Sequence, residues 1–324
     1  MSSIVKASVD QPLNTPLLFL VFNRPDTTRE VFESIRRVKP LHLYIAADGP
    51  RLNRQGESEL VSEVREIVNA VDWPCKVNTL FRRENLGCKL AVSEAISWFF
   101  ENEEFGIILE DDCLPSPDFF PYCEELLHRY RDNDQVFAVT GNNFQDGIRR
   151  GESAYYFSRY FHCWGWASWR RAWKTYDVNM SYWPDWLNSE DWKCKVPDRV
   201  ERNFWQTIFN NTFSGKINTW DYQWSARIWQ AGGVVATPNV NLVTNIGFGA
   251  DATHTLSENS KLAEMPTESL GSLTHPLKVQ RNLASERYVF DYYLGGADMR
   301  FPRREKVFFL RQLKKIWRIF FQNK

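Results

Sequence analysis

The stretch FGIILEDDCLPSPDFF, residues 105 to 120, decides the fold. Its apolar Ile-Ile-Leu run predicts a short buried strand, and that strand ends in three consecutive carboxylates, Glu110, Asp111 and Asp112. The Pro-x-Pro that follows prevents the strand from continuing, so the acids are expected at its C-terminal end. In open α/β sheets this edge is where ligands bind.

Three adjacent carboxylates repel one another, and a hard divalent cation with oxygen ligands relieves that repulsion. Mn²⁺ or Mg²⁺ is therefore the expected cofactor. A cation held in this way commonly bridges to substrate phosphates, so the triplet predicts a nucleotide-sugar site. The alternative is a solvated acidic turn, which is disfavoured because the acids directly follow a buried apolar strand.

Strand and helix signals alternate on both sides of this stretch. Strands are expected at 16–22, 42–47, 76–81, 106–109 and 136–140, and helices at 27–38, 57–70, 89–100 and 118–130. Asp26 or Thr27 is expected to cap the first helix at its N-terminus. The alternation predicts an α/β fold in which helices flank a doubly wound sheet.

The pattern changes after about residue 150, where aromatic residues dominate. Many of the 14 tryptophans lie between residues 164 and 229. Such rings form either a thick core or stacking platforms for sugars, and at least half of them are expected in the core. Residues 234–243 again predict an extended segment. The polar, Gly/Ser/Thr-rich residues 244–275 predict a loop over a site.

Composition narrows the partners and the compartment. The chain of 324 residues carries 40 basic and 40 acidic residues, so no overall field points to nucleic acid. Six cysteines show no CxxC pair and no metal-ligand spacing. The N-terminal residues contain no apolar signal run, and no stretch approaches the ~20 apolar residues of a membrane span. A cytoplasmic protein with reduced thiols is expected.

Residues 303–324 differ in kind. Eight Lys and Arg accompany a single acid, Glu305, and apolar residues recur at three- and four-residue steps. A basic amphipathic helix of this type suits an anionic membrane surface, which would place the protein peripherally on the inner face of the membrane. A C-terminal helix docked on the domain or on a partner protein is the equal alternative.

The order of these signals resembles the nucleotide-sugar glycosyltransferases of the A-type fold, and most closely the N-acetylglucosaminyltransferase I family. The segment EDDCLPSPDFF is similar to that family's Glu-Asp-Asp followed by a Pro-Asp-Phe-Phe helix start. The resemblance covers residues 16 to about 255 and is strongest at 105–120 and 160–173. It implies a Rossmann-like mixed sheet of the GT-A type and a bacterial enzyme of cell-surface glycan synthesis.

The resemblance also divides the chain into five parts. They are an N-terminal arm (1–15), a nucleotide-sugar-binding half (16–145), an acceptor and catalytic half of the same domain (146–256), a loop-rich tail (257–302) and the basic amphipathic helix (303–324).

On the donor side, the resemblance implies that Arg24 contacts the diphosphate and that Asp48 hydrogen-bonds the uracil. A guanidinium fork suits phosphate oxygens. The alternatives are an exposed arginine in a turn and an ordinary Asp-Gly turn. Within the triplet, Asp112 would ligate the metal, Asp111 would face the ribose or a metal-bound water, and Glu110 would orient the sugar.

Two further segments are matched to the donor. FHCWGWASWRRAW resembles the family's Gly-Trp segment before a short helix beneath the donor sugar. In it Gly165 would permit close backbone approach, and Trp164 or Trp166 would pack on the sugar ring. NIGFGADATHT lies where the family has a loop that orders over the donor. Its His254 would touch a phosphate or the metal, or act only as a hydrogen-bonding bystander.

The Trp220-Asp221 pair resembles the family's Trp-Asp pair, in which the Asp is the catalytic base. An inverting transfer needs one carboxylate that takes the proton of the attacking acceptor hydroxyl. This chain departs from the family directly after the pair, where Tyr-Gln-Trp replaces a second acid. Asp185 or Asp191 is therefore retained as the fallback base.

Together these features predict an inverting, metal-dependent transferase. It would move a sugar, with N-acetylglucosamine the leading candidate, from a UDP-sugar to a glycan or lipid-linked acceptor in surface polysaccharide synthesis. Nucleotidyltransferases share the fold but have a Gly-rich basic loop after the first strand, where this chain has Asn-Arg-Pro-Asp-Thr. The other alternative is a non-catalytic carbohydrate- or nucleotide-sugar-binding protein, against which the intact acid triplet and Asp221 argue.

Overall fold

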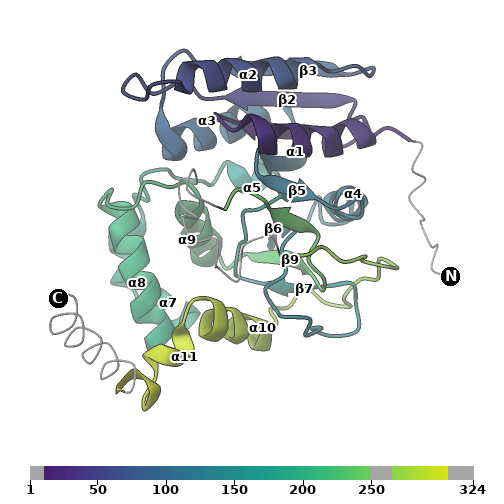
Figure 1. Ribbon diagram of the computed structural model, residues 1–324. Helices are drawn as coiled ribbons and strands as arrows, with labels where there is room; N and C mark the ends of the chain where they lie inside the picture. Colours follow the sequence, from purple (N-terminus) through teal and green to yellow (C-terminus); the bar gives the residue numbers. More distant parts are fainter. Residues whose placement is uncertain (1–10, 249–264, 306–324) are drawn as a thin grey trace, which may run out of the picture.

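The computed structural model describes residues 11–248 and 265–305, and an eight-stranded mixed sheet lies at its centre (Figure 1). The strand order is β3-β2-β1-β4-β8-β6-β9-β7. The strands are β1 (Leu17–Val21), β2 (His42–Ala47), β3 (Lys76–Phe81), β4 (Phe105–Glu110), β6 (Val136–Thr140), β7 (Tyr155–Ser158), β8 (Trp166–Trp169) and β9 (Val234–Pro238). The predicted mixed α/β fold class is confirmed.

The first four strands in space, β3, β2, β1 and β4, are parallel, as the alternation of strands and helices predicts. Beyond them the sheet is mixed, because β8 pairs antiparallel with both β4 and β6, and β7 pairs antiparallel with β9. The doubly wound pattern therefore holds for the first half of the chain only.

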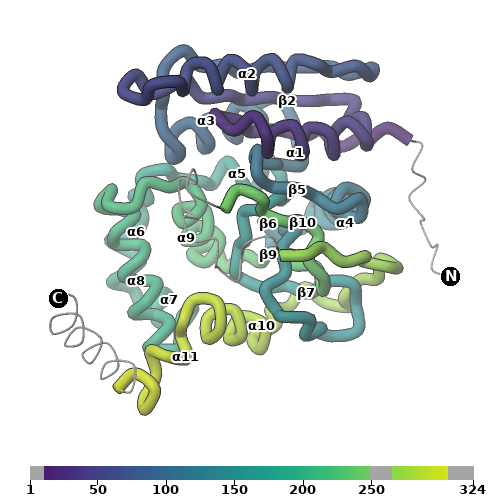
Figure 2. Tube along the Cα trace, in the orientation of Figure 1, coloured from purple at the N-terminus to yellow at the C-terminus, as the bar shows by residue number. Residues whose placement is uncertain are grey.

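Helices cover both faces of this sheet. They are α1 (Pro25–Val38), α2 (Glu57–Asn69), α3 (Gly87–Asn102), α4 (Phe119–Arg129), α5 (Arg170–Trp173), α6 (Trp183–Leu187), α7 (Glu190–Lys195), α8 (Arg199–Phe213), α9 (Asp221–Ala231), α10 (Leu283–Tyr288), the π-helix η1 (Val289–Tyr293) and α11 (Gly296–Met299). Figure 2 shows α10 and α11 beside the ends of α7 and α8, and α11 contacts α8.

Alternation along β1 shows why both faces need a cover. Leu17, Phe19 and Val21 join a core with α1, α2 and α4, whereas Leu18 and Leu20 join a second core with α3, α8 and α9. Successive side chains of a strand point to opposite faces, so a continuous apolar run requires burial on both sides. The second core holds most of the tryptophans, as expected for at least half of them.

The expected elements of the first 140 residues agree with the structure to within two residues at each end. The predicted cap of α1 is wrong. The capping position is Arg24, and Pro25 opens the helix two residues earlier than expected. Proline suits that position because its missing N–H would be unpaired there. Thr28 contributes instead by donating its hydroxyl to the Arg24 carbonyl at 2.6 Å.

The Pro-x-Pro motif acts differently from expectation. β4 ends at Glu110 as predicted, but the chain resumes as β5 (Cys113–Pro115), which pairs antiparallel with β10 (Val243–Asn245). The segment 234–243 is accordingly two strands, β9 in the main sheet and the start of β10 outside it. This small ribbon brings the chain after β10 next to the acid triplet.

The C-terminal part is only partly the loop-rich tail that we expected. Residues 265–282 form no helix, whereas α10, η1 and α11 follow. His254 and nearly all of the expected basic helix, beyond Glu305, lie outside the described residues. Within the described ranges, no helix has both the length and the apolarity needed to cross a bilayer.

A buried ionic network ties this tail to the domain. Arg159, which is 4% exposed, pairs with Glu201 of α8 and lies 3.8 Å from Glu286 of α10. Its guanidinium also stacks over the Trp229 ring at 4.2 Å. Arg281 adds a second ion pair to Glu286 at 2.5 Å. The positive charges of two arginines thus compensate the negative charges of two glutamates, one on α8 and one on α10.

Replacing Arg159 with methionine is expected to lower the free energy of unfolding by about 3 kcal/mol, because it leaves carboxylates buried without their cation. Urea unfolding measures this change. Arg36→Met is the control, since Arg36 pairs with Asp72 on the exposed surface and its loss should leave the transition unchanged. Equal transitions for both variants would show that the network does not stabilise the fold.

Candidate functional site

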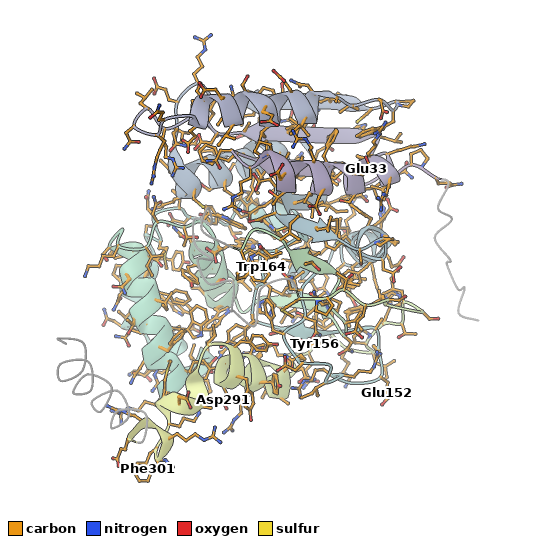
Figure 3. The ribbon with its side chains drawn as sticks, viewed as in Figure 1. Glu33, Glu152, Tyr156, Trp164, Asp291 and Phe301 are labelled. Atoms are coloured by element: carbon orange, nitrogen blue, oxygen red, sulfur yellow. The ribbon has the colours of Figure 1, made fainter. Side chains whose placement is uncertain are left out.

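A cavity of about 650 Å³ runs from the carboxyl ends of β1, β2 and β4 along α9 to η1. Its size and its mixture of aromatic and charged walls are those of a small-molecule site. Trp164, which lines the cavity, lies at the middle of the molecule in Figure 3. The ligand-binding edge expected from the position of the acids is therefore hollow.

The acid triplet lines this cavity. Glu110 ends β4, and Asp111 and Asp112 form the turn that follows. Asp111 accepts a hydrogen bond from the Phe22 amide at 3.0 Å. Burial, and then repulsion from Asp112, raises the pKa of Glu110 well above its usual range, and the same two causes raise the pKa of Asp111 to about 7. Negative charge is in excess at this edge.

Arg24 and Asp112 form an ion pair inside the cavity, with 2.7 Å between Nη1 and Oδ2. The chain after β10 lies against this pair. A Cβ added to Gly247 would come within 2.2 Å of Asp112 Oδ2 and 2.6 Å of Arg24 Nη1, so only glycine fits there. The Ile246 amide donates to the Asp112 carbonyl at 2.8 Å. The two residues that we matched to metal and diphosphate are thus adjacent and paired.

The donor set fits a divalent cation of the hard type. All three groups of the triplet offer oxygen, and burial together with repulsion from Asp112 raises the pKa of Glu110 and of Asp111, a strain that a bound cation would relieve. In residues 11–248 and 265–305, no three His, Cys, Asp or Glu side chains are grouped to hold a metal by themselves. A cation at this site would therefore be held by one protein carboxylate together with ligands from outside the described residues.

Asp48 also lines the cavity, but its carboxylate is engaged by the chain after β3. It accepts hydrogen bonds from the amides of Gly49, Leu86 and Gly87 and from the Asn85 side chain, at 2.9–3.1 Å. A carboxylate has about four acceptor sites, so these donors fill it. The predicted hydrogen bond to uracil would have to displace one of them.

Of the two tryptophans considered for the donor sugar, Trp164 lines the cavity and Trp166 does not. Trp166 lies in β8, is fully buried, and stacks on Trp220 with ring centroids 5.5 Å apart. Trp220 lines the cavity but is only 2% exposed, so its ring belongs to the core. Trp164, the other residue considered, is half-buried and packs against Phe144 and Phe248, at 5.8 and 5.7 Å.

Gly165 has a structural reason to be glycine. Its φ is +66°, and a Cβ there would lie 2.8 Å from Cγ2 of Val243 in β10. The close approach expected at Gly165 is therefore made by a strand of this chain. Gly165 is not among the residues that line the cavity.

Asp221 faces the same cavity as the acid triplet. It is the first residue of α9, and the Thr219 hydroxyl donates to its Oδ1. Its charge contributes to the raised pKa of Glu110, which places the two carboxylates within electrostatic reach of each other. The fallback bases do not share this position, because Asp185 and Asp191 are exposed and lie outside the cavity wall.

Several cavity residues had no recognisable signal in the sequence. Arg51 and Arg82 line it near Asp48, and Cys88 lines it near Asp221 and the triplet. His162 is a further wall residue. Burial lowers the pKa of His162 to about 3, so its imidazole is neutral. Burial and the surrounding carboxylates raise the pKa of Cys88 to about 12, so it stays a thiol. His162 lies within FHCWGW, the segment that also contains Trp164 and Gly165.

Comparison with protein-family models gives no match, and comparison with curated proteins gives none either. Among solved structures, the chain is similar to 4-diphosphocytidyl-2C-methyl-D-erythritol synthase from Anaerococcus prevotii, with 10% identity, a TM-score of 0.30 and coverage of 54% of this chain and 77% of that one.

Two further solved structures are similar at the same level. Mouse xyloside xylosyltransferase 1 has 11% identity and a TM-score of 0.32, with coverage of 66% of this chain and 81% of that one. A UDP-glucose pyrophosphorylase has 8% identity and a TM-score of 0.31, with coverage of 68% and 90%. Structural similarity at this level says nothing about the reaction that this protein catalyses or about its ligands.

Proposed function

We propose that the protein is an inverting glycosyltransferase that uses a UDP-sugar and a divalent cation, Mn²⁺ or Mg²⁺. The observation that supports this most is the convergence of Arg24, Asp112 and Asp221 on one cavity, from the ends of β1 and β4 and the start of α9. These three side chains supply a phosphate-binding cation, a metal-binding oxygen and a proton acceptor.

The donor would lie with its nucleotide toward β2 and β3. Three arginines line that end of the cavity, Arg24, Arg51 and Arg82. Guanidinium groups bind phosphate oxygens through paired N–H donors, so they suit a diphosphate. Burial and the neighbouring carboxylates raise the pKa of Glu110, which favours its protonated form, and a protonated carboxyl can donate a hydrogen bond to a sugar hydroxyl.

Asp112 would hold the cation. When bound, the cation neutralises negative charge that grows on the departing diphosphate. Arg24 would then leave Asp112 and turn to the diphosphate, so that its positive charge stays in the cavity throughout the reaction.

Asp221 would take the proton from the acceptor hydroxyl while that oxygen attacks the anomeric carbon. The Thr219 hydroxyl holds one oxygen of this carboxylate in place by donating a hydrogen bond to it. One base suffices because inversion needs no covalent intermediate. We propose a glycan or lipid-linked acceptor in surface polysaccharide synthesis, and N-acetylglucosamine as the sugar.

The test is the release of UDP from UDP-N-acetylglucosamine and related UDP-sugars, with and without Mn²⁺. The proposal expects metal-dependent release that increases when acceptor glycans are added. Metal-dependent binding of UDP-sugars without any release or transfer would favour the alternative, a non-catalytic nucleotide-sugar-binding protein.

Replacing Arg24 with glutamine is expected to have opposite effects on the two ligands. Without its partner, Asp112 should bind Mn²⁺ alone about tenfold more tightly, whereas UDP should bind the metal-loaded protein about tenfold less tightly. Calorimetric titrations of each ligand measure both constants. Arg29→Gln is the control on the same helix, since Arg29 is half-exposed and pairs with Asp26 and Glu63 outside the cavity. Parallel changes in both affinities would contradict the account of the pair.

A further inference from the structure

We propose that the end of the cavity farthest from β2 binds the acceptor as a neutral saccharide, whose ring stacks on a continuous belt of aromatic side chains. The inference rests on the proposed function and adds the class of acceptor to it. We call these residues the aromatic belt: Phe144, Tyr160, His162, Trp205, Tyr222 and Tyr293, all of which line the cavity.

Each ring of the belt contacts the next. Ring centroids are 6.0 Å apart between Tyr222 and Trp205, and 5.8 Å between Trp205 and Tyr160. Tyr160 stacks on His162 at 6.5 Å with only 8° between the ring planes. Phe144 continues the belt, 4.4 Å from His162 and 5.2 Å from Tyr293. Five separate segments of the chain thus form one aromatic cluster.

The belt is held rigid from behind. The Tyr160 hydroxyl donates to Glu201 at 2.5 Å, and the Trp205 indole donates to the same hydroxyl at 3.2 Å. The Tyr293 hydroxyl donates to Asp146. These polar tips are therefore committed to the protein. Tyr160 and Trp205 are only 4% and 5% exposed and support the belt from behind, so the half-buried rings of His162, Tyr222 and Tyr293 are the ones that can face a ligand. A ring fixed in advance loses little conformational entropy on binding.

Two members keep a polar tip available. Within the described ranges, neither the Tyr222 hydroxyl nor the His162 imidazole makes a hydrogen bond. Apolar rings with a few polar groups between them match a sugar, which has a face of C–H groups and an edge of hydroxyls. Tyr293 also lies in the π-helix η1, a form that often occurs at functional sites.

The belt begins at the proposed base. Tyr222 follows Asp221 in α9, and the Asp221 carboxylate contributes to the raised pKa of Tyr222 and of Cys163, the neighbour of His162. A sugar stacked on the belt would therefore present a hydroxyl next to Asp221. The acceptor and the donor would meet at that carboxylate from opposite ends of the cavity.

Charge indicates a neutral acceptor. The arginines of the wall, Arg24, Arg51 and Arg82, are all on the donor side, and among the described wall residues no Lys or Arg accompanies the belt. The pKa of His162 is too low for it to carry a charge. The described wall residues at this end would offer the carboxylate of an acidic sugar no positive charge, which disfavours its binding.

The test measures direct binding of the methyl glycosides of glucose, galactose, mannose and N-acetylglucosamine to the intact protein. Saturation-transfer NMR detects this binding. We expect at least one to bind, and methyl glucuronide to bind about tenfold more weakly than methyl glucoside if glucoside is a ligand. Tyr293→Ala should weaken binding roughly five- to tenfold, and Tyr293→Phe should restore it because the ring remains. Tyr292→Ala is the matched control, since Tyr292 lies on the same π-helix, is 58% exposed and is not part of the cavity wall.

UDP affinity in the presence of Mn²⁺ is measured on the same samples, together with their melting temperatures. Equal weakening by Tyr293→Ala and Tyr292→Ala would overturn the inference. A wild-type protein that binds UDP but no neutral glycoside would also overturn it. So would one that binds decyl phosphate in place of glycosides, because that result would indicate a lipid acceptor. Neither of these two results would contradict the proposed function. Glycoside binding that depends on Tyr293 without any UDP binding would support the belt and overturn the proposed function.

Discussion

Replacing Asp221 with asparagine is expected to lower sugar transfer by roughly 10²- to 10⁴-fold, the usual contribution of a general base. Asparagine keeps the shape of the side chain and can still accept a hydrogen bond from the Thr219 hydroxyl, so α9 should begin in the same way. It cannot take a proton at neutral pH. UDP affinity should hardly change, because Asp221 lies toward the aromatic belt and the arginines lie toward β2.

The measurement is product formed per enzyme, with UDP affinity determined for the same variant. Asp185→Asn is the control, since this carboxylate is exposed on α6 and outside the cavity. Near-normal turnover of Asp221→Asn would exclude Asp221 as the base. Loss of UDP binding would instead assign Asp221 to the donor pocket, and the reaction would then need another proton acceptor.

Replacing Asp112 with alanine is expected to abolish the effect of Mn²⁺ on UDP binding. The side chain is 16% exposed in the cavity wall, and its loss removes the carboxylate that we propose as the metal ligand. The pKa of Asp111 should also fall, because Asp112 is, after burial, the largest cause of its elevation. The fold should persist, since the sheet pairing of β4 ends before this residue.

Calorimetry with UDP, with and without Mn²⁺, provides the test. Asp26→Ala serves as the control, because that carboxylate is 99% exposed at the start of α1. Unchanged UDP affinity with Mn²⁺ in Asp112→Ala would show that the metal is held elsewhere or not used. Loss of UDP binding even without metal would indicate that Asp112 acts through Arg24 alone.

The sheet of the first half could be predicted because its signals are local. An apolar run, a turn residue and a helix stripe each lie within a few neighbours of the residue concerned, as at β1 and α1. The same locality placed the acid triplet at the ligand-binding edge, since a buried strand must deliver its next residues there. The prediction of the α1 cap was wrong because the helix begins at Pro25, before the polar residues that were expected to cap it.

The second half depends on contacts between distant segments. Trp164 and Trp166 look alike in sequence, but β8 is inserted between β4 and β6, and that pairing buries Trp166 and leaves Trp164 at the cavity. Position 165 requires glycine because Val243, nearly eighty residues later in the chain, packs directly against it. The aromatic belt has the same origin, because its members come from separate loops and from α8, α9 and η1.

The central claim is that the cavity binds a nucleotide sugar together with a divalent cation, and thermal unfolding of the intact protein tests it most directly. UDP-, GDP- and dTDP-sugars are compared with and without Mn²⁺. A ligand stabilises the native state by an amount that grows with its concentration relative to its dissociation constant, about 2.7 kcal/mol at a hundredfold excess. The account predicts that a UDP-sugar raises the melting temperature most, and only when Mn²⁺ is present. No shift with any nucleotide sugar, or the same shift without metal, would contradict it.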